Sequence, residues 1–371
     1  MRLRPLSLAA LLGLALTAAT ATAAPVTASD TDYGLKTGTP DLKSAGALAF
    51  GPAGILFVAD PQGGAVFAID TGDRRANGNG PVKMAKADER MAGLLGTTAS
   101  EISIADMAVN PASGNVYFSV ARGRGPEAPP VLLKLNRQGE FAEVPLKDVP
   151  FAKATLPDPA KPRPGAQANR MRAPAITGLA FIDGKLYVAA LSNEEFDSTF
   201  RAIPFPFQDV AKGTNVQIYH GSHGRLETNA PIRTFTKYEI AGTAHLLAAY
   251  TCTPLVKIPL TDLQPGAKVK GTTVAELGNR NTPLDMVVYA KGGKDYLLMI
   301  NDNRGVMKVD LEKIGTVDGI NARVQNTAGL PYETIPDLKG VVQMSRLDNE
   351  HALILVKGQD GRQNLETIEL P

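Results

Sequence analysis

The amino-acid sequence predicts an all-β protein, a β-propeller of six four-stranded antiparallel blades. Short apolar runs occur along the whole chain and are separated by glycines (36) and prolines (27). Each set of runs reads as strand, tight turn, strand, polar turn, strand, with the turn residues of β-hairpins. The sets recur with a period of roughly 45 to 60 residues, which is typical of propeller blades.

The repeat has six units, and each begins with the strand that would lie innermost in its blade. The units begin at Ala45, Ile104, Ile176, Phe235, Leu284 and Val341. The spacing is looser between the first and third units, where a Pro-rich segment, 149–174, is inserted. A seventh, degenerate blade in that segment is the alternative to six.

The ends of the repeat predict how the ring closes. The last unit has only three strands, the third at 364–370, so its fourth strand must come from elsewhere. The segment TDYGLKTG, at 31–38, precedes the first innermost strand. We expect this N-terminal segment to complete the last blade and cover its sheet edge, which makes 31–371 a single propeller domain.

Residues 1–24 have the layout of a secretory signal peptide. Arg2 and Arg4 precede an apolar run, and small residues follow up to Ala24. The run is shorter than the ~20 residues that a membrane-spanning helix needs, and no other stretch is long enough. We therefore expect an exported, soluble, monomeric protein, periplasmic or extracellular, without a membrane span.

Charge and cysteine content narrow the classes of partner. The 39 basic and 37 acidic residues nearly balance, so no nucleic-acid partner is expected. Cys252 is the single cysteine, which excludes an intramolecular disulfide. In an exported protein an odd cysteine is a free thiol, an intermolecular bridge or a ligand.

The repeat pattern resembles that of the six-bladed NHL-repeat and SMP-30/gluconolactonase-like propellers. The resemblance covers the mature chain in pattern and not in residue motifs, so it concerns the fold more than the chemistry. If the strands of a blade are named a to d from the centre outward, it implies that the b–c turns and d–a connections emerge on one face. Ligands of such propellers commonly bind on that face.

His220 and His223 form an H-x-x-H between the outer strand of blade 3 and the innermost strand of blade 4. They are therefore placed on the same face as Glu194 and Cys252, which lie in the b–c turns of blades 3 and 4. Two imidazoles with a carboxylate or thiolate would suit a divalent metal ion such as Zn or Cu. The alternative is a glycine-rich turn with exposed imidazoles, and Cys252 is alternatively a buried apolar residue.

The other two histidines are expected to be structural. His245 begins the b strand that ends near Cys252, and seven extended residues span roughly 23 Å. His245 therefore lies toward the opposite face, and His351 occupies the equivalent place in its own blade.

Two aspartates occupy equivalent positions in innermost strands. Asp106 in blade 2 and Asp285 in blade 5 align with each other. In a ring numbered in chain order these blades are diametrically opposite, so inward-pointing carboxylates would face each other across the channel and bind Ca²⁺. Alternatively, both are hydrogen-bonded structural groups.

The predicted ligand face also carries candidate catalytic residues. Glu194 belongs to an acidic turn within 192–207, and Asp302 and Arg304 belong to the b–c turn of blade 5. A carboxylate there could serve in acid–base chemistry. Arginines on this face would suit an anionic or sugar-acid ligand; they are Arg122, Arg124, Arg280 and Arg304.

Two classes of function follow from this placement. The first is an exported metal-dependent hydrolase, lactonase- or esterase-like by resemblance, that acts on a small molecule at the loop face. A copper oxidoreductase using the histidines and Cys252 is a less supported form of it. The alternative is a non-catalytic propeller of the cell envelope that binds a ligand or a protein.

Overall fold

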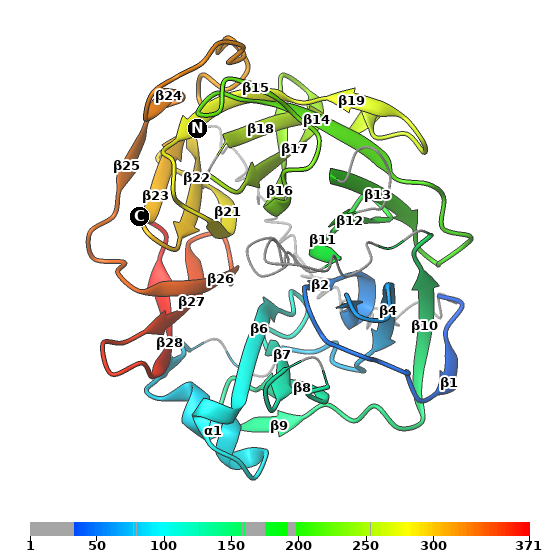
Figure 1. Ribbon diagram of the computed structural model, residues 1–371. Coiled ribbons are helices and arrows are strands. Elements are labelled where there is room, and N and C mark those ends of the chain that lie inside the picture. Colours follow the sequence, from blue (N-terminus) through cyan, green and yellow to red (C-terminus); the bar gives the residue numbers. More distant parts are fainter. Residues whose placement is uncertain are drawn as a thin grey trace, which may run out of the picture. The chain divides into compact units, whose positions relative to one another are not determined.

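The computed structural model describes residues 33–371 except for 77, 79, 126, 158, 160–174, 192–197 and 253. The expected signal peptide (1–24) and Glu194 therefore lie outside the described residues. Tyr33–Pro371 forms a compact unit. Its described residues form six sheets of four to six strands, antiparallel except where β14 pairs with β19, arranged as a ring (Figure 1). The predicted six-bladed propeller is confirmed.

The blades are named 1 to 6 in the chain order of their innermost strands. Blade 1 contains β2 (Leu48–Phe50), β3 (Ile55–Asp60), β4 (Ala65–Asp70), β10 (Val149–Thr155) and β1 (Lys36–Gly38). Blade 2 contains β6 (Ile102–Val109), β7 (Val116–Arg122), β8 (Pro130–Leu135) and β9 (Phe141–Glu143). Blade 3 contains β11 (Ile176–Ile182), β12 (Lys185–Leu191), β13 (Ser198–Pro204), β14 (Thr214–His220) and β15 (Arg225–Glu227), and β19 (Lys268–Lys270) pairs with β14.

The remaining blades follow in the same way. Blade 4 contains β16 (Ile232–Ile240), β17 (Thr243–Tyr250), β18 (Pro254–Pro259), β20 (Thr272–Leu277) and β24 (Thr327–Gly329). Blade 5 contains β21 (Pro283–Lys291), β22 (Lys294–Asn301), β23 (Gly305–Asp310) and β25 (Tyr332–Thr334). Blade 6 contains β26 (Val341–Arg346), β27 (His351–Lys357), β28 (Gln363–Glu369) and β5 (Lys83–Met84).

Helical structure is short in the described part of the chain. One α-helix, α1 (Ala87–Leu94), lies between β5 and β6, and single turns of 3-10 helix lie at Pro52–Gly54, Ala99–Glu101 and Leu260–Asp262. No helix among the described residues is long and apolar enough to cross a membrane.

Two-residue turns join the a and b strands of blades 3, 4 and 5. Both residues of each turn have positive φ, at Asp183–Gly184, Ala241–Gly242 and Gly292–Gly293. Positive φ at both central positions is the type I′ geometry, whose twist matches that of antiparallel strands. The Gly-containing turns read from the sequence therefore form the predicted hairpins.

The order of blades around the ring differs from their order in the chain. Neighbouring innermost strands pack in the cyclic order β2, β6, β26, β21, β16, β11 (Figure 1). Blade 1 therefore lies between blades 2 and 3, and blade 2 lies between blades 1 and 6. The chain leaves blade 1 after β4, builds blade 2, and returns through β10, which pairs with β4.

This exchange also changes the closure of the last blade. Residues 31–38 were expected to supply its fourth strand, and that expectation is wrong: β1 pairs with β10 in blade 1. The fourth strand is β5, which pairs with β28 through Met84 and Lys83. Val82 extends this contact because its N–H donates to Thr367 Oγ1 (2.9 Å) and its carbonyl accepts from Thr367 N (2.8 Å).

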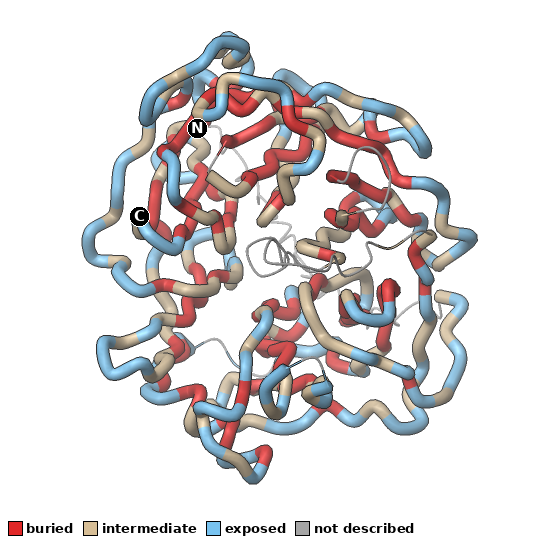
Figure 2. Tube along the Cα trace, viewed as in Figure 1, coloured by how far each residue is buried: buried red, intermediate tan, exposed pale blue. Residues whose placement is uncertain are grey.

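Buried residues occur in the strands of every blade (Figure 2). Their side chains form clusters that join adjacent blades, which confirms the order of the blades. Phe57 of blade 1 stacks on Phe181 of blade 3, with ring centroids 5.5 Å apart. Phe50 of blade 1 meets Tyr117 of blade 2 edge to face at 5.1 Å. Each fully buried side chain of this size contributes about 1.5–3 kcal/mol by leaving water, so the exchanged blades are held by ordinary core packing.

Candidate metal centre

The hairpin of β14 and β15 lies at the outer edge of the ring (Figure 1), and its turn contains His220 and His223. His220 ends β14 and pairs with Arg225, the first residue of β15. The N–H groups of His223 and Gly224 both donate to the carbonyl of His220, at 3.1 and 2.8 Å. This turn brings the two imidazole rings together, with their centroids 3.9 Å apart and their planes inclined by 38°.

A single carboxylate holds both imidazoles. Glu227 Oε2 lies 2.7 Å from His220 Nδ1, and Glu227 Oε1 lies 2.6 Å from His223 Nδ1. Burial would raise the pKa of Glu227, but the hydrogen bonds and charges of the two histidines outweigh it and lower this pKa to about 2. With both Nδ1 atoms bonded to the carboxylate, each ring has its Nε2 left to bind something else.

Cys252 approaches the two rings from the b–c turn of blade 4. Its N–H donates to the carbonyl of Asn281 (2.9 Å), and its backbone has a left-handed φ of 65°. One ligand atom from each of His220, His223 and Cys252 lies within 4.8 Å of the other two. The expectation that these three residues emerge together is confirmed.

One nitrogen of this group stands out by its burial. The His220 side chain is only 2% exposed, and its Nε2 has no hydrogen-bond partner among the described residues. A buried polar atom without a partner costs about 1–3 kcal/mol. Because His220 is grouped with a second imidazole and a thiol, this unpartnered nitrogen favours a ligand that binds there.

The turn between the histidines is clamped from two other elements. Glu276 of β20 accepts from Gly221 N (2.5 Å) and from Ser222 Oγ (3.1 Å). Burial raises the pKa of Glu276, although His220 and these donors oppose that shift. On the other side, Val324 N donates to the carbonyl of Gly221 (3.0 Å). The hairpin is therefore held in place before any ligand arrives.

The donor set decides which ions suit the centre. Two imidazole nitrogens and one thiolate are ligands for zinc or copper, whereas Ca²⁺ and Mg²⁺ prefer oxygen. Three protein ligands leave a fourth tetrahedral position open, as in catalytic zinc sites. Glu227 supplies the carboxylate that commonly orients metal-binding histidines through their second ring nitrogen.

The sequence interpretation did not include Glu227 or Glu276. The sequence did contain a signal for Glu227. A four-residue turn after His220 pairs His220 with Arg225, and this register places Glu227 diagonally opposite His220 in the hairpin. No local signal points to Glu276, since its contact with Gly221 joins residues 55 positions apart.

The other candidate catalytic residues lie around the connection between blades 4 and 5. Asp302 Oδ1 accepts from Thr282 N (2.7 Å), and Arg304 Nη2 donates to the carbonyl of Asn279 (3.2 Å). This connection also receives the N–H of Cys252 through Asn281. Asp302 and Arg304 are not members of the metal-binding group, and their catalytic roles stay predictions.

The two remaining histidines lie apart from the centre, as expected. His245 Nδ1 is bonded to the carbonyl of Thr243 (2.8 Å) at the start of β17. His351 Nδ1 pairs with Asp348 (3.0 Å) at the start of β27.

Asp106 and Asp285 are not diametrically opposite, because blades 1 and 2 exchange places in the ring. Only blade 6 separates them. Asp106 accepts from Met107 N (2.8 Å) and from Leu48 N of blade 1 (2.7 Å). Asp285 accepts in the same way from Met286 N (2.8 Å) and from Met344 N of blade 6 (3.1 Å).

Each of these carboxylates therefore bridges two neighbouring blades. Burial raises the pKa of both, and the charge of Asp106 raises that of Asp285 further. Between them, Gln343 Nε2 donates to the carbonyl of Ile104 (3.3 Å). These bonds support the structural alternative, and a Ca²⁺ ion at this place stays a prediction.

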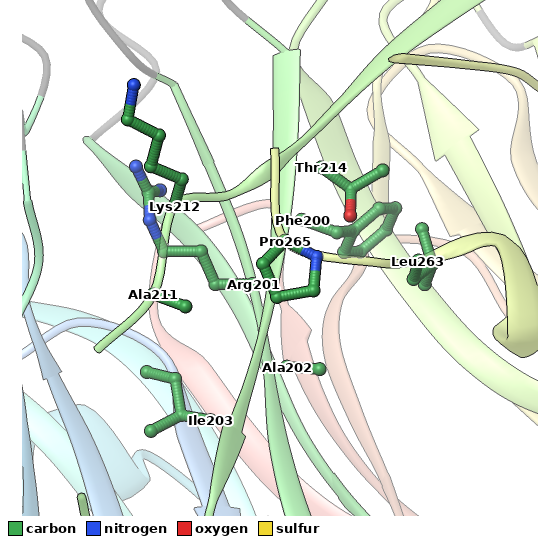
Figure 3. Close-up of a pocket in the computed structure, with 9 residues that line it drawn as sticks. All are labelled: Phe200, Arg201, Ala202, Ile203, Ala211, Lys212, Thr214, Leu263 and Pro265. Carbon is green, nitrogen blue, oxygen red and sulfur yellow. The ribbon is translucent and has the colours of Figure 1, made fainter. Parts of the chain in front are cut away.

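A small cavity lies elsewhere on blade 3 (Figure 3). It is lined by Phe200, Arg201, Ala202, Ile203, Ala211, Lys212, Thr214, Leu263 and Pro265. Thr214 and His220 are the two ends of β14, and an extended strand of this length spans roughly 20 Å. The cavity is therefore not part of the metal centre.

Comparison with known proteins gives structural neighbours but no family. No protein-family model matches the sequence, and no curated protein matches it. A solved oxidoreductase (glucose dehydrogenase) of Thermus thermophilus is 16% identical with a TM-score of 0.35, over 90% of this chain and 100% of that one. The PQQ-bound aldose sugar dehydrogenase of Streptomyces coelicolor is 12% identical with a TM-score of 0.33, over 90% and 96%.

A streptogramin B lyase is 10% identical with a TM-score of 0.36, over 91% of this chain and 97% of that one. At such identities and TM-scores nothing about a site is carried over from these proteins.

Proposed function

We propose that this propeller is an exported, zinc-dependent hydrolase whose ion is held by His220, His223 and Cys252. The observation that carries the proposal is the buried His220 Nε2, which has no hydrogen-bond partner in the described structure. A Cys–His–Glu nucleophilic arrangement would need one imidazole, whereas two imidazoles held by one carboxylate fit a metal ion better. The hydrolase class follows the resemblance to gluconolactonase-like propellers, and export follows the signal-peptide layout of 1–24.

When bound, zinc would polarise an ester or lactone carbonyl and make water a nucleophile near neutral pH. The protein prepares the site for this. The Nδ1 atom of each histidine faces Glu227, an arrangement that favours the tautomer with the proton on Nδ1 and the lone pair on Nε2. Cys252 must lose its proton to bind the ion, so metal uptake releases protons and strengthens as pH rises.

The reaction itself is balanced without an oxidant. The oxygen of water bonds to the acyl carbon, the bond from that carbon to the leaving oxygen breaks, and a proton of water ends on the leaving oxygen. The donor set departs from the Glu, Asn and Asp ligands that the resemblance implies, since nitrogen and sulfur replace oxygen. The ion is therefore proposed from this chain's own residues.

Copper is the second candidate, because two histidines and one cysteine also form the trigonal set of copper electron-transfer sites. Elemental analysis distinguishes copper from zinc because it identifies the bound ion.

The test is elemental analysis of the purified, untagged protein, followed by assays on p-nitrophenyl acetate, on a neutral lactone, and on an ester and a lactone that each carry a carboxylate. We expect about one zinc per chain in the wild type and in His351→Ala, a histidine remote from the site, and loss in His223→Ala and Cys252→Ser. No metal above background in the wild type would overturn the proposal. A stoichiometric zinc without hydrolysis of any ester or lactone would favour a non-catalytic binding propeller.

A further inference from the structure

The described side chains of the metal centre differ in their exposure to solvent. The His220 and Glu227 side chains are 2% and 7% exposed, whereas those of His223 and Arg225 are 45% and 70% exposed. A substrate that enters from solvent on this side meets His223 and Arg225. What it meets there decides which substrates suit the site.

Arg225 is oriented by the same carboxylate that holds the histidines. Its Nε donates to Glu227 Oε1 (3.2 Å), the oxygen that lies 2.6 Å from His223 Nδ1. Within the described part of the chain its guanidinium makes no other hydrogen bond, so both terminal nitrogens remain free to donate. A guanidinium held at one nitrogen with two free donors matches the geometry of a carboxylate or phosphate.

Arg323 flanks the same turn from the other side. A β-carbon at Gly224 would lie 3.0 to 3.1 Å from Cβ, Cγ and Cδ of Arg323, so the stem of this arginine lies against the turn. Its segment is anchored by Val324 N to the carbonyl of Gly221 (3.0 Å) and by Ile320 N to the carbonyl of Thr273 (2.8 Å). Arg323 is exposed and has no hydrogen bond or ion pair among the described residues.

Positively charged groups gather at the exposed edge of this centre. Arg225 and Arg323 both lie at the turn that carries His223, and a bound divalent ion would add positive charge beside them. The Glu227 carboxylate is already bonded to both histidines and to Arg225 Nε. Guanidinium groups with free donors beside a cation attract anions.

We propose that the substrate carries an anionic group, a carboxylate or a phosphate, which Arg225 and Arg323 bind beside the bond that is cleaved. This inference rests on the proposed function, because it takes the metal-bound centre as the place of reaction. It limits the substrates to acidic esters or lactones, such as sugar-acid derivatives, and disfavours neutral ones.

The test uses the Co²⁺-substituted protein, whose visible spectrum changes when a ligand reaches the open position. Inorganic phosphate, acetate and neutral imidazole are titrated separately. We expect Arg225→Gln and Arg323→Gln each to weaken binding of an anion about fivefold, and the double variant about 25-fold. In these three variants the affinity for imidazole and for Co²⁺ should stay within about twofold of the wild type. In the control Arg90→Gln the affinity for every probe should stay within the same limit.

The two anions distinguish the two possible substrate groups. If only acetate binds in an arginine-dependent way, the substrate carries a carboxylate. If only phosphate does, the substrate carries a phosphate. If the variants bind both anions like the wild type, or lose imidazole equally, the inference fails while the metal centre stands. If the wild type shows no thiolate-to-cobalt absorption, the proposed function fails and this inference with it.

Discussion

Two polar clusters of this propeller are built around acidic groups shielded from solvent, and they use them in opposite ways. In the inner strands, both oxygens of Asp106 and of Asp285 accept backbone N–H groups, so each carboxylate joins two blades. At the rim, Glu227 binds two histidines through their Nδ1 atoms, and His220 Nε2 has no hydrogen-bond partner among the described residues. A displaced pKa therefore does not distinguish a functional cluster from a structural one. A single unpartnered atom does not distinguish them either, because Gln343 Oε1 beside the two aspartates also lacks a partner. What distinguishes the rim, within the described part of the chain, is that ligand atoms of two histidines and a cysteine lie within 4.8 Å of one another.

The largest effect is expected in the inner-strand cluster. Asp106→Ala leaves the N–H groups of Leu48 and Met107 without acceptors, and both residues are buried. We expect the free energy of unfolding to fall by about 2 to 3 kcal/mol, measured by urea denaturation. The zinc content should not change. A loss of zinc in this variant would contradict the separation of the two clusters.

The next effect belongs to the rim. Glu227→Gln keeps the size of the side chain but can no longer accept a hydrogen bond at both ends. One histidine then loses the partner that orients it, and we expect the affinity for Zn²⁺ to fall about 10- to 100-fold in a chelator competition. Asp285→Asn is the matched control and should bind Zn²⁺ like the wild type. Equal affinity in Glu227→Gln would mean that the carboxylate does not support the metal.

The fold was largely predictable from the sequence because hairpins are local. Each predicted unit begins in, or a few residues before, the innermost strand of its blade. The Asp183–Gly184 turn shows why, because its two residues both have positive φ and join adjacent strands of one hairpin. The closure was not predictable, because β5 is a two-residue strand whose pairing with β28 spans most of the chain. The assumption that chain order equals ring order failed for the same reason, since only the long-range return of β10 reveals the exchange.

The candidate site was predictable in part. The face shared by His220, His223 and Cys252 followed from the repeat alone, because equivalent turns of equivalent blades emerge together. The clamp of Glu276 on Gly221 could not be read, since it depends on how far β14 extends beyond blade 3 toward blade 4. Long-range contacts of single side chains carry no periodic signal.

A smaller effect is expected from pH. The native pKa values of Asp106 and Asp285 are raised above the ordinary value of 3.8 by burial, so the folded state binds protons more tightly than the unfolded chain. The stability that these groups contribute is present below pH 3.8 and is lost as pH rises through the native values.

Asp285→Asn mimics the protonated acid and should remove part of this loss. We expect the variant to lose about 1 kcal/mol less than the wild type between pH 4 and pH 8, measured by urea denaturation across that range. Parallel stability–pH curves for the two proteins would show that Asp285 titrates in the folded state as it does in the unfolded chain.

The smallest expected effect tests whether the inner-strand carboxylates retain any capacity for a cation. Each oxygen of Asp106 already accepts an N–H, and a hard cation such as Ca²⁺ needs six to eight oxygen ligands. We therefore expect saturating Ca²⁺ to raise the Tm by less than about 1 °C. Because a substitution of Asp106 is expected to lower stability by itself, the comparison must be the Ca²⁺-induced shift of Tm within each protein rather than the Tm itself. A shift of several degrees in the wild type that disappears in Asp106→Asn would make this cluster a binding site as well, and the two regions would no longer differ in function.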